Sequence, residues 1–281
     1  MKSGTSCFSS MRHPGFILAV VCFLLIWGNG RSGAQALERL NPKTLDLFDE
    51  AKRTFDSAYF MSEINGEFIE GRMSDELIQR NFTSLEKKRP TIIFSHGCTG
   101  LGHGNLRYMR LLAEAGYAVI APDSFARRYR PETCDPSWRR GIKGAPHRLV
   151  NRMRQEEIHH AAYRVRRIRW VDKKNLFLMG HSQGGTAAAA YEGDDFKAHV
   201  ISGSVCWRGL RSPRGTPILA LYSADDPWRR NRPADSCLRK ARARGVNMEF
   251  HLFEGRAHNL SRNKMARRQI LDFLGRHRST E

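Results

Sequence analysis

The segment from Asn175 to Ala190 constrains the fold of this chain more than any other. It opens with four apolar residues, Leu176–Met179, a run of the right length for a buried strand. It closes with Thr186 and four alanines, which have high helix propensity. Between them lies Gly180-His181-Ser182-Gln183-Gly184, a Gly-x-Ser-x-Gly pattern. The segment therefore predicts a strand, a tight turn that carries Ser182, and a helix.

A serine on such a turn is held in a strained conformation, and its hydroxyl projects outward. Glycines two positions to either side are needed because a Cβ there would strike the neighbouring strand or helix. The following helix directs its N-terminal amides at the serine and stabilises negative charge there. The pattern alone is weak, since a plain strand-turn-helix with an inert serine also fits it. The flanking strand and helix favour a nucleophile.

Length and charge narrow the class of protein. The chain has 281 residues, 41% of them hydrophobic, which suits one α/β domain or two small ones with a real core. Its formal net charge of +19 would suit a protein that binds nucleic acid or an anionic surface. The basic residues are spread over all segments, however, and no nucleic-acid-binding module is recognisable. We therefore expect a generally basic, solvated surface that favours anionic partners, without a specific nucleic-acid partner.

The first 36 residues have the pattern of a secretory signal peptide. Lys2 and Arg12 precede an apolar run at 16–27. A helix needs about 20 apolar residues to cross a bilayer, so this run is too short to do so comfortably. The sequence Ala34-Gln35-Ala36 then provides a small-x-small cleavage site. Cleavage near Ala36 leaves no stable membrane span, and the alternative is an uncleaved anchor. Either case places the folded part outside the cytoplasm, in a secreted or periplasmic protein.

Four cysteines remain after such a cleavage, which in an oxidising compartment indicates up to two disulfides with three possible connectivities. Cys206 follows one core strand and Cys237 follows the next, so their loops are expected to be neighbours. This favours the pair Cys206–Cys237 and leaves Cys98–Cys134 as the remainder. Four free buried thiols are the alternative.

Strands and helices alternate along the rest of the chain. Residues 37–89 are expected to form an N-terminal extension, and residues 90–281 a catalytic domain. Because most of the strands are continuously apolar, they predict an α/β fold with a mostly parallel sheet covered by helices on both faces. The expected strands are 91–95, 117–121, 176–179, 199–205, 217–222 and 248–253, and the expected helices are 105–115, 149–171, 234–244 and 262–274.

A serine becomes a good nucleophile when a base accepts its proton and a carboxylate orients that base. In a sheet of this kind the acid follows a later strand, and the histidine follows the last one. Asp225 and Asp226 both follow the strand at 217–222, and His258 follows the strand at 248–253. We predict Ser182 as nucleophile, His258 as base and Asp225 as acid, with Asp226 as the alternative acid.

The reaction also needs hydrogen-bond donors for the oxyanion. One candidate is the backbone N–H of Gln183, directly after the nucleophile. The second is the backbone N–H of Cys98, in the glycine-rich loop that follows the strand at 91–95. His96 in the same loop is expected to brace it rather than to transfer protons.

Several of these motifs together resemble the α/β-hydrolase superfamily, and within it the dienelactone hydrolase-like branch. They are His96-Gly-Cys-Thr-Gly, Pro122-Asp-Ser-Phe, Gly180-His-Ser-Gln-Gly-Gly, Ser223-Ala-Asp-Asp-Pro-Trp with Cys237 downstream, and Ala257-His258. The resemblance implies the α/β-hydrolase fold and the roles of Ser182, Asp225 and His258. Dienelactone hydrolases proper carry a cysteine where Ser182 stands, so this chain departs from them at the nucleophile.

These observations predict a secreted or periplasmic serine hydrolase that cleaves a carboxylic ester. The expected substrate is a small acyl molecule, and no metal or organic cofactor is expected. Alternatives are a thioesterase, peptidase or acyltransferase with the same three residues, or a non-catalytic basic binding protein. The Arg-rich loop at 127–140 either borders the pocket and favours an anionic substrate or is a solvated basic loop. The sequence does not indicate an oligomeric state.

Overall fold

The structure, a computed structural model, describes residues 47–129, 134, 148–229 and 231–280. The predicted signal peptide and most of the Arg-rich loop lie outside these residues. The strands are β1 (Tyr59–Ile64), β2 (Glu67–Arg72), β3 (Arg89–Ser95), β4 (Ala118–Ala121), β5 (Val171–His181), β6 (His199–Ser202), β7 (Ile218–Ser223) and β8 (Met248–Phe253). The helices are α2 (Leu47–Asp56), α3 (Glu76–Ser84), α4 (His103–Glu114), α5 (Arg148–Val165), α6 (Gln183–Ala189), α7 (Ser236–Arg244) and α8 (Lys264–Arg276), with 3₁₀ turns at Ser124–Ala126 and Pro227–Arg229.

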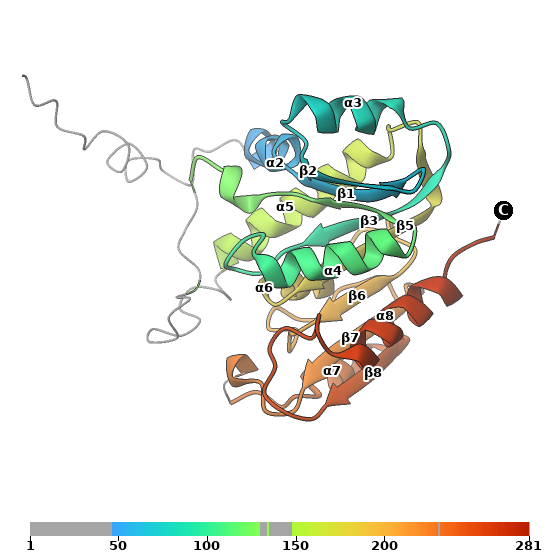
Figure 1. The fold of residues 1–281 in the computed structure, drawn as a ribbon. Helices are drawn as coiled ribbons and strands as arrows, with labels where there is room; N and C mark the ends of the chain where they lie inside the picture. Colours follow the sequence, from blue (N-terminus) through green and yellow to red (C-terminus); the bar gives the residue numbers. More distant parts are fainter. Residues whose placement is uncertain (1–46, 130–133, 135–147, 230, 281) are drawn as a thin grey trace, which may run out of the picture. The chain divides into compact units, whose positions relative to one another are not determined.

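The eight strands form one sheet in the order β2-β1-β4-β3-β5-β6-β7-β8 (Figure 1). Strands β4, β3, β5, β6, β7 and β8 pair in parallel, and β1 and β2 are antiparallel to their neighbours. Full burial of β4 and β7 explains the continuous apolar runs Ala118–Ala121 and Ile218–Tyr222. The predicted mostly parallel α/β sheet is confirmed.

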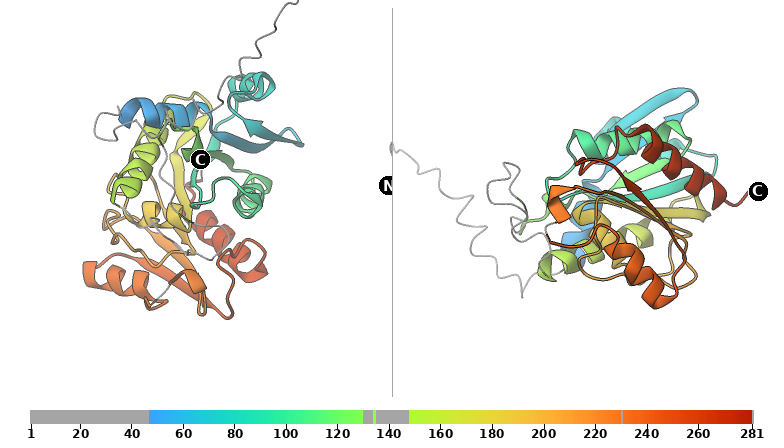
Figure 2. Two further views of the ribbon diagram at one scale, coloured as in Figure 1. Left: turned by 90° about the vertical axis from the view of Figure 1, so that its left-hand side faces the viewer. Right: turned by 90° about the horizontal axis from the view of Figure 1, so that it is seen from below.

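Helices cover both faces of the sheet (Figure 2). On one face, α5 and α6 pack over the central strands, and Phe55 of α2 and Ala241 of α7 extend this core. On the other face, α4 contributes Tyr108 and Leu112, and α8 contributes Ile270 and Phe273. The central strands are therefore held from both sides by apolar packing.

The segment predicted as an N-terminal extension belongs to the same sheet. Strand β1 pairs with β2 and with β4, where Met61 lies opposite Val119. Helix α5 ends at Val165, earlier than the predicted end at residue 171. The chain turns there, and the buried Trp170 donates its indole N–H to the carbonyl of Phe82 at 2.6 Å. Val171 then begins β5.

The parallel register brings five loops to one edge of the sheet. Ser95 of β3 lies opposite Gly180 of β5, and His181 lies opposite Ser202 of β6. Ser223 ends β7 beside Phe253, which ends β8. Ligand sites in parallel sheets form outside the carboxyl ends of the strands. Every residue that the sequence predicted to take part in the reaction follows the end of one of these strands.

Candidate active site

Ser182 occupies a sharp turn between β5 and α6. Its backbone has φ 57° and ψ −115°, a conformation that costs a non-glycine residue roughly 1–3 kcal/mol. A Cβ on Gly184 would lie 1.8 Å from the carbonyl oxygen of Ser95, and one on Gly180 would lie 2.2 Å from the carbonyl oxygen of Gly184. The glycines are therefore required by close backbone packing, as the sequence pattern indicated.

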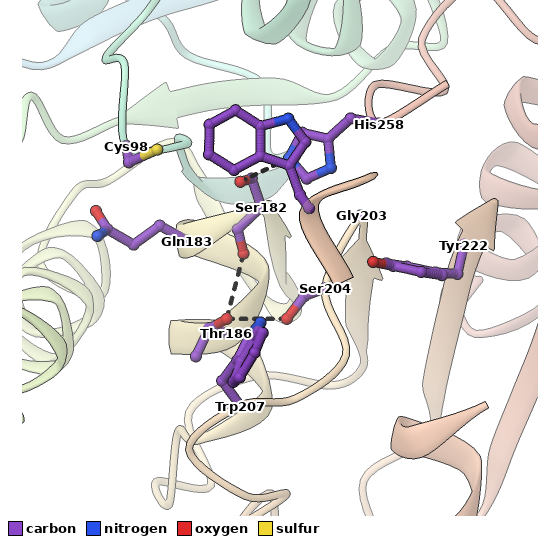
Figure 3. A pocket seen from close by; sticks show the side chains of 10 residues that line it. Cys98, Ser182, Gln183, Thr186, Gly203, Ser204, Trp207, Tyr222 and His258 are labelled. Carbon is purple, nitrogen blue, oxygen red and sulfur yellow. Dashed lines mark hydrogen bonds between the residues drawn. The ribbon is translucent and has the colours of Figure 1, made fainter. Parts of the chain in front are cut away.

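The hydroxyl of Ser182 is bonded to a histidine, and that histidine to a carboxylate. Ser182 Oγ lies 2.8 Å from Nε2 of His258. His258 donates from Nδ1 to Oδ2 of Asp226 at 2.7 Å. The side chain of His258 is 19% exposed, whereas that of Asp226 is fully buried. Figure 3 shows Ser182 and His258 facing each other at the mouth of a pocket.

The expectation that Asp225 holds the histidine is wrong, because Asp226 occupies that position. Asp225 donates its backbone N–H to the carbonyl of Gly255 at 3.1 Å, and its side chain is exposed. The chain turns tightly after β7, and the N–H of Asp226 is 3.3 Å from the carbonyl of Ser223. This turn directs the second aspartate inward, so a shift of one residue reverses which side chain reaches His258.

Two further donors hold the carboxylate of Asp226. The backbone N–H of Trp228 donates to Oδ1 at 2.9 Å. The hydroxyl of the buried Tyr222 also bonds this carboxylate, and burial followed by the charge of Asp226 raises the pKa of Tyr222. Because its oxygens accept hydrogen bonds from several sides, Asp226 presents a fixed acceptor to the imidazole.

Trp228 is a residue of the site that sequence reasoning did not assign. Its indole stacks on the imidazole of His258, with ring centroids 5.3 Å apart and planes inclined by 29°. The aromatic face excludes water from one side of the ring and can interact favourably with a charged imidazolium. The signal was present as the tryptophan in Ser223-Ala-Asp-Asp-Pro-Trp, directly after the acid.

The loop that carries His258 is anchored at two points. The buried hydroxyl of Tyr108, on α4, accepts from the backbone N–H of Leu260 at 2.9 Å and bonds Ser202 Oγ at 2.7 Å. Ser223 Oγ donates to the carbonyl of Ala257 at 2.6 Å. Burial raises the pKa of Tyr108, so its proton stays available for this network. Helix α4 and strand β7 thus set the position of the histidine.

His181 directly precedes the nucleophile and packs between two rings of the site. It is 5% exposed, and its ring lies 5.1 Å from that of His258 and 5.6 Å from that of Tyr108. Burial, and secondarily the charge of His258, holds the pKa of His181 well below its usual value. The residue is therefore neutral and places no second positive charge against His258.

The loop after β3 lies directly against the nucleophile. A Cβ on Gly97 would be 3.4 Å from the Cβ of Ser182, and both Cys98 and Gln183 line the pocket. His96 is fully buried, and its Nε2 accepts the backbone N–H of Ser124 at 3.1 Å. The expected bracing role of His96 is confirmed by this contact.

A buried ion-pair network supports that loop from below. Arg154 of α5 donates from Nη2 to Ser95 Oγ at 2.8 Å and to the carbonyl of His96 at 2.7 Å. Its Nη1 donates to Glu157 Oε2 at 2.6 Å. Ser124 and Arg127 donate to the same carboxylate, each at 2.6 Å. The sequence analysis did not identify Arg154 and Glu157. Their spacing of three residues is typical of any ion pair on the surface of a helix.

The first two arginines of the Arg-rich loop do not line this pocket. Arg127 is buried against Glu157, and Arg128 bonds Glu50 of α2 through its backbone N–H and its guanidinium. The charges of these two arginines are therefore paired with buried carboxylates instead of being offered to a substrate.

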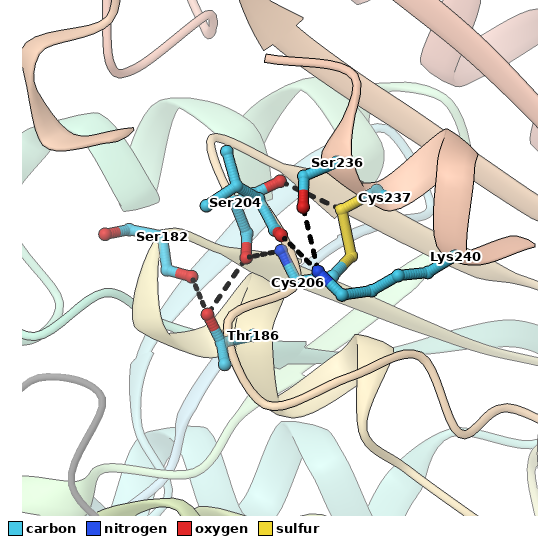
Figure 4. The surroundings of a disulfide bond; sticks show 8 residues. Ser182, Thr186, Ser204, Cys206, Ser236, Cys237 and Lys240 are labelled. Carbon is cyan, nitrogen blue, oxygen red and sulfur yellow. Dashed lines mark hydrogen bonds between the residues drawn. A yellow bond between two sulfur atoms is a disulfide. The ribbon is translucent and has the colours of Figure 1, made fainter. Parts of the chain in front are cut away.

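The predicted disulfides are present as Cys98–Cys134 and Cys206–Cys237. The second disulfide joins the segment after β6 to α7, beside the pocket (Figure 4). In that segment Ser204 Oγ accepts from the N–H of Cys206 at 3.2 Å and lies 2.9 Å from Thr186 Oγ1. The disulfide therefore holds this pocket wall to α7, and the contact between Ser204 and Thr186 holds it to α6, the helix that follows Ser182.

The pocket beside Ser182 is small, and both aromatic and polar side chains line it. Its volume of about 30 Å³ leaves room for about two water molecules. Side chains of Trp207, Tyr222 and Trp228 line it together with the hydroxyls of Thr186 and Ser204. In the described part of the chain, no three His, Cys, Asp or Glu side chains are grouped so that they could hold a metal ion.

Comparisons with known proteins show the family of this chain. The model of the dienelactone hydrolase family matches residues 80–269. Among curated proteins, argininosuccinate synthase of Archaeoglobus fulgidus is 31% identical over 78 residues, which cover 26% of this chain. This chain spans only 20% of the length of that protein. The short match carries no argument about activity.

Solved structures share the fold at low sequence identity. Est1E from Butyrivibrio proteoclasticus is 15% identical, with a TM-score of 0.52 over 78% of this chain and 93% of that one. A dienelactone hydrolase-like promiscuous phosphotriesterase, P91, from metagenomic libraries is 14% identical, with a TM-score of 0.51 over 78% of this chain and 97% of that one. These likenesses concern the architecture alone.

Proposed function

Because this chain belongs to the dienelactone hydrolase family and is a serine hydrolase of the carboxylic-ester type, we propose that Ser182, His258 and Asp226 cleave a carboxylic ester through an acyl-enzyme. One observation carries the proposal: a continuous line of hydrogen bonds from Ser182 Oγ through the imidazole to Asp226, at 2.8 and 2.7 Å, beside a pocket.

The first half of the reaction forms the acyl-enzyme. Ser182 Oγ attacks the ester carbonyl carbon while His258 Nε2 accepts its proton. Asp226 holds the imidazole in the tautomer that leaves Nε2 free to do so. The tetrahedral oxyanion accepts hydrogen bonds from the backbone N–H groups of Cys98 and Gln183. As the carbon–oxygen bond to the alcohol breaks, His258 returns the proton to the departing oxygen.

The second half releases the acid. A water molecule attacks the acyl carbonyl while His258 accepts one of its protons. The bond to Ser182 Oγ breaks, and that oxygen recovers the proton from His258. The acid leaves and the free enzyme is restored. Trp228 limits solvent access to the imidazole during both halves, since it covers one ring face.

We propose further that the protein works in an oxidising compartment, as a secreted or periplasmic enzyme. Two disulfides support this, because such bonds persist outside the reducing cytosol. Among the helices that the structure describes, none is long and apolar enough to cross a membrane.

A serine-directed fluorophosphonate probe, followed by peptide mass mapping, tests the proposal together with a panel of small carboxylic esters. We expect labelling at Ser182 and ester turnover in the natural protein, and loss of both in Ser182→Ala. The control is Ser84→Ala on the exposed end of α3, which should keep both. Turnover that survives in a folded Ser182→Ala variant would disprove the assignment.

A further inference from the structure

A second, larger hollow lies beside the proposed catalytic pocket. This arginine groove runs between α5 and the segment after β6, and its volume is about 300 Å³. That volume is at the lower end of the range for small-molecule sites, roughly 300–1,000 Å³. Arg148 and Arg152 of α5 form one wall, and Arg208 and Arg211 form the other.

Three of the four arginines carry unpaired charge. Arg211 bonds Glu192 at 2.6 Å, so these two side chains offset each other. Among the described residues, Arg148, Arg152 and Arg208 form no ion pair with an acidic side chain. Glu156 also lines the groove and compensates one of the three positive charges. The groove therefore keeps a net positive charge, which favours an anionic occupant over a neutral or cationic one.

The linings of the groove and of the catalytic pocket contain residues that are close together in the chain. Beside α5, Thr186 of α6 lines the pocket, and Ala190, which directly follows α6 and donates its N–H to the carbonyl of Thr186, lines the groove. Four residues of helix correspond to a rise of about 6 Å. On the opposite wall, Trp207 lines the pocket and the next residue, Arg208, lines the groove. A molecule that reaches past Trp207 from Ser182 would enter the groove.

We propose that the arginine groove is a substrate subsite that binds an anionic group, a carboxylate or a phosphate, remote from the scissile ester. The inference rests on the proposed ester hydrolysis at Ser182. The small pocket holds the reacting end of the substrate, and the guanidinium groups bind the charged end about one helical turn away. Guanidinium groups bind both anions because their planar donors match paired oxygens.

The test compares esters that differ only in charge at the far end. One series consists of 4-nitrophenyl monoesters of dicarboxylic acids of rising length, beside 4-nitrophenyl alkanoates of the same length. A second series carries the carboxylate, or a phosphate, on the alcohol side of an acetyl ester. The measured quantity is the ratio of kcat/KM for the anionic ester to that for its neutral counterpart.

We expect a ratio of roughly five to ten for the longer esters in at least one series, falling as salt is added, since partly exposed ion pairs are individually weak and screened. In Arg152→Gln/Arg208→Gln the ratio should fall towards one. The control, Arg242→Gln/Arg267→Gln, removes the same charge from exposed positions on α7 and α8 and should keep the ratio.

A ratio near one in both series, a ratio that persists in the groove variant, or an equal loss in the control would overturn the groove proposal. Hydrolysis of the neutral esters in those cases would leave the proposed function standing. Absence of all ester turnover, with no labelling of Ser182, would instead reject the proposed function.

Discussion

Arg154 donates to the carbonyl oxygen of His96 at 2.7 Å, from a side chain that is only 3% exposed. It thereby connects helix α5 to the loop whose next residues, Gly97 and Cys98, face Ser182. Burial lowers the pKa of Arg154, and the adjacent Glu157 opposes that shift. The loop is therefore held by a charge that depends on its carboxylate partner.

Replacing Arg154 should impair both stability and turnover. Removing one partner of a buried ion pair costs about 3–5 kcal/mol, so we expect Arg154→Met to unfold at much lower urea concentration. Arg154→Lys keeps the charge but cannot bond Ser95, His96 and Glu157 together. In that variant kcat should fall about tenfold or more with little change in KM. Arg169→Lys, at an exposed position after α5, is the control, and an unchanged kcat in Arg154→Lys would contradict the positioning role.

The two adjacent aspartates should behave differently. Asp226→Asn is expected to lower kcat by about 10³–10⁴, because the amide favours the wrong tautomer of His258. Asp225→Asn, at an exposed side chain, should stay within about twofold of the natural enzyme. Steady-state kinetics on one ester, with circular dichroism to verify folding, separates them. A larger loss for Asp225→Asn would reverse the assignment.

A methyl group at Gly184 has no room. Gly184→Ala places a Cβ 1.8 Å from the carbonyl oxygen of Ser95, so the strand or the helix must shift. We expect a loss of about 3 kcal/mol or more in unfolding free energy, or failure to accumulate as soluble protein. At Gly215 no heavy atom lies within 4 Å of an added Cβ, and Gly215→Ala should change stability by about 0.5 kcal/mol or less. Equal thermal stability of the two variants would be inconsistent with the packing described.

Stability should depend on pH through the buried His199. Burial lowers the pKa of His199 to about 3, whereas an unfolded histidine titrates near about 6.5. Between these two pH values, His199 is protonated in the unfolded chain but neutral in the folded protein. The unfolding free energy therefore rises as the pH rises and decreases as the pH falls. His199→Asn can keep the bond to Ser212 Oγ, which is 2.9 Å in the natural protein. Between pH 3 and 6.5, the unfolding free energy of His199→Asn, measured with urea, should therefore rise less steeply with pH than that of the natural protein. The two slopes should differ by up to about 1.4 kcal/mol per pH unit. Identical slopes would show that His199 does not contribute.

The alternation of apolar runs, glycine-bounded turns and helical segments was sufficient to predict the parallel sheet and the turn at Ser182. Those patterns are local, because a buried strand must be apolar and a tight turn between close backbones must be glycine. The order of nucleophile, acid and histidine along the chain indicated His258. The strand positions indicated the disulfide Cys206–Cys237 and left Cys98–Cys134 as the remainder. Strands β1 and β2 mix apolar with charged residues, so their place on one side of the sheet left no such local signal.

By itself, then, the sequence determined the class of fold, the position of Ser182 and the histidine that reaches it. Only the tertiary structure decided between Asp225 and Asp226, because one residue of turn geometry reverses the direction of a side chain. It likewise brought Arg154 under the loop at His96 and placed Trp228 on His258. Contacts of this kind join residues far apart in the chain. The number of residues between two positions does not indicate whether they are close in the folded protein.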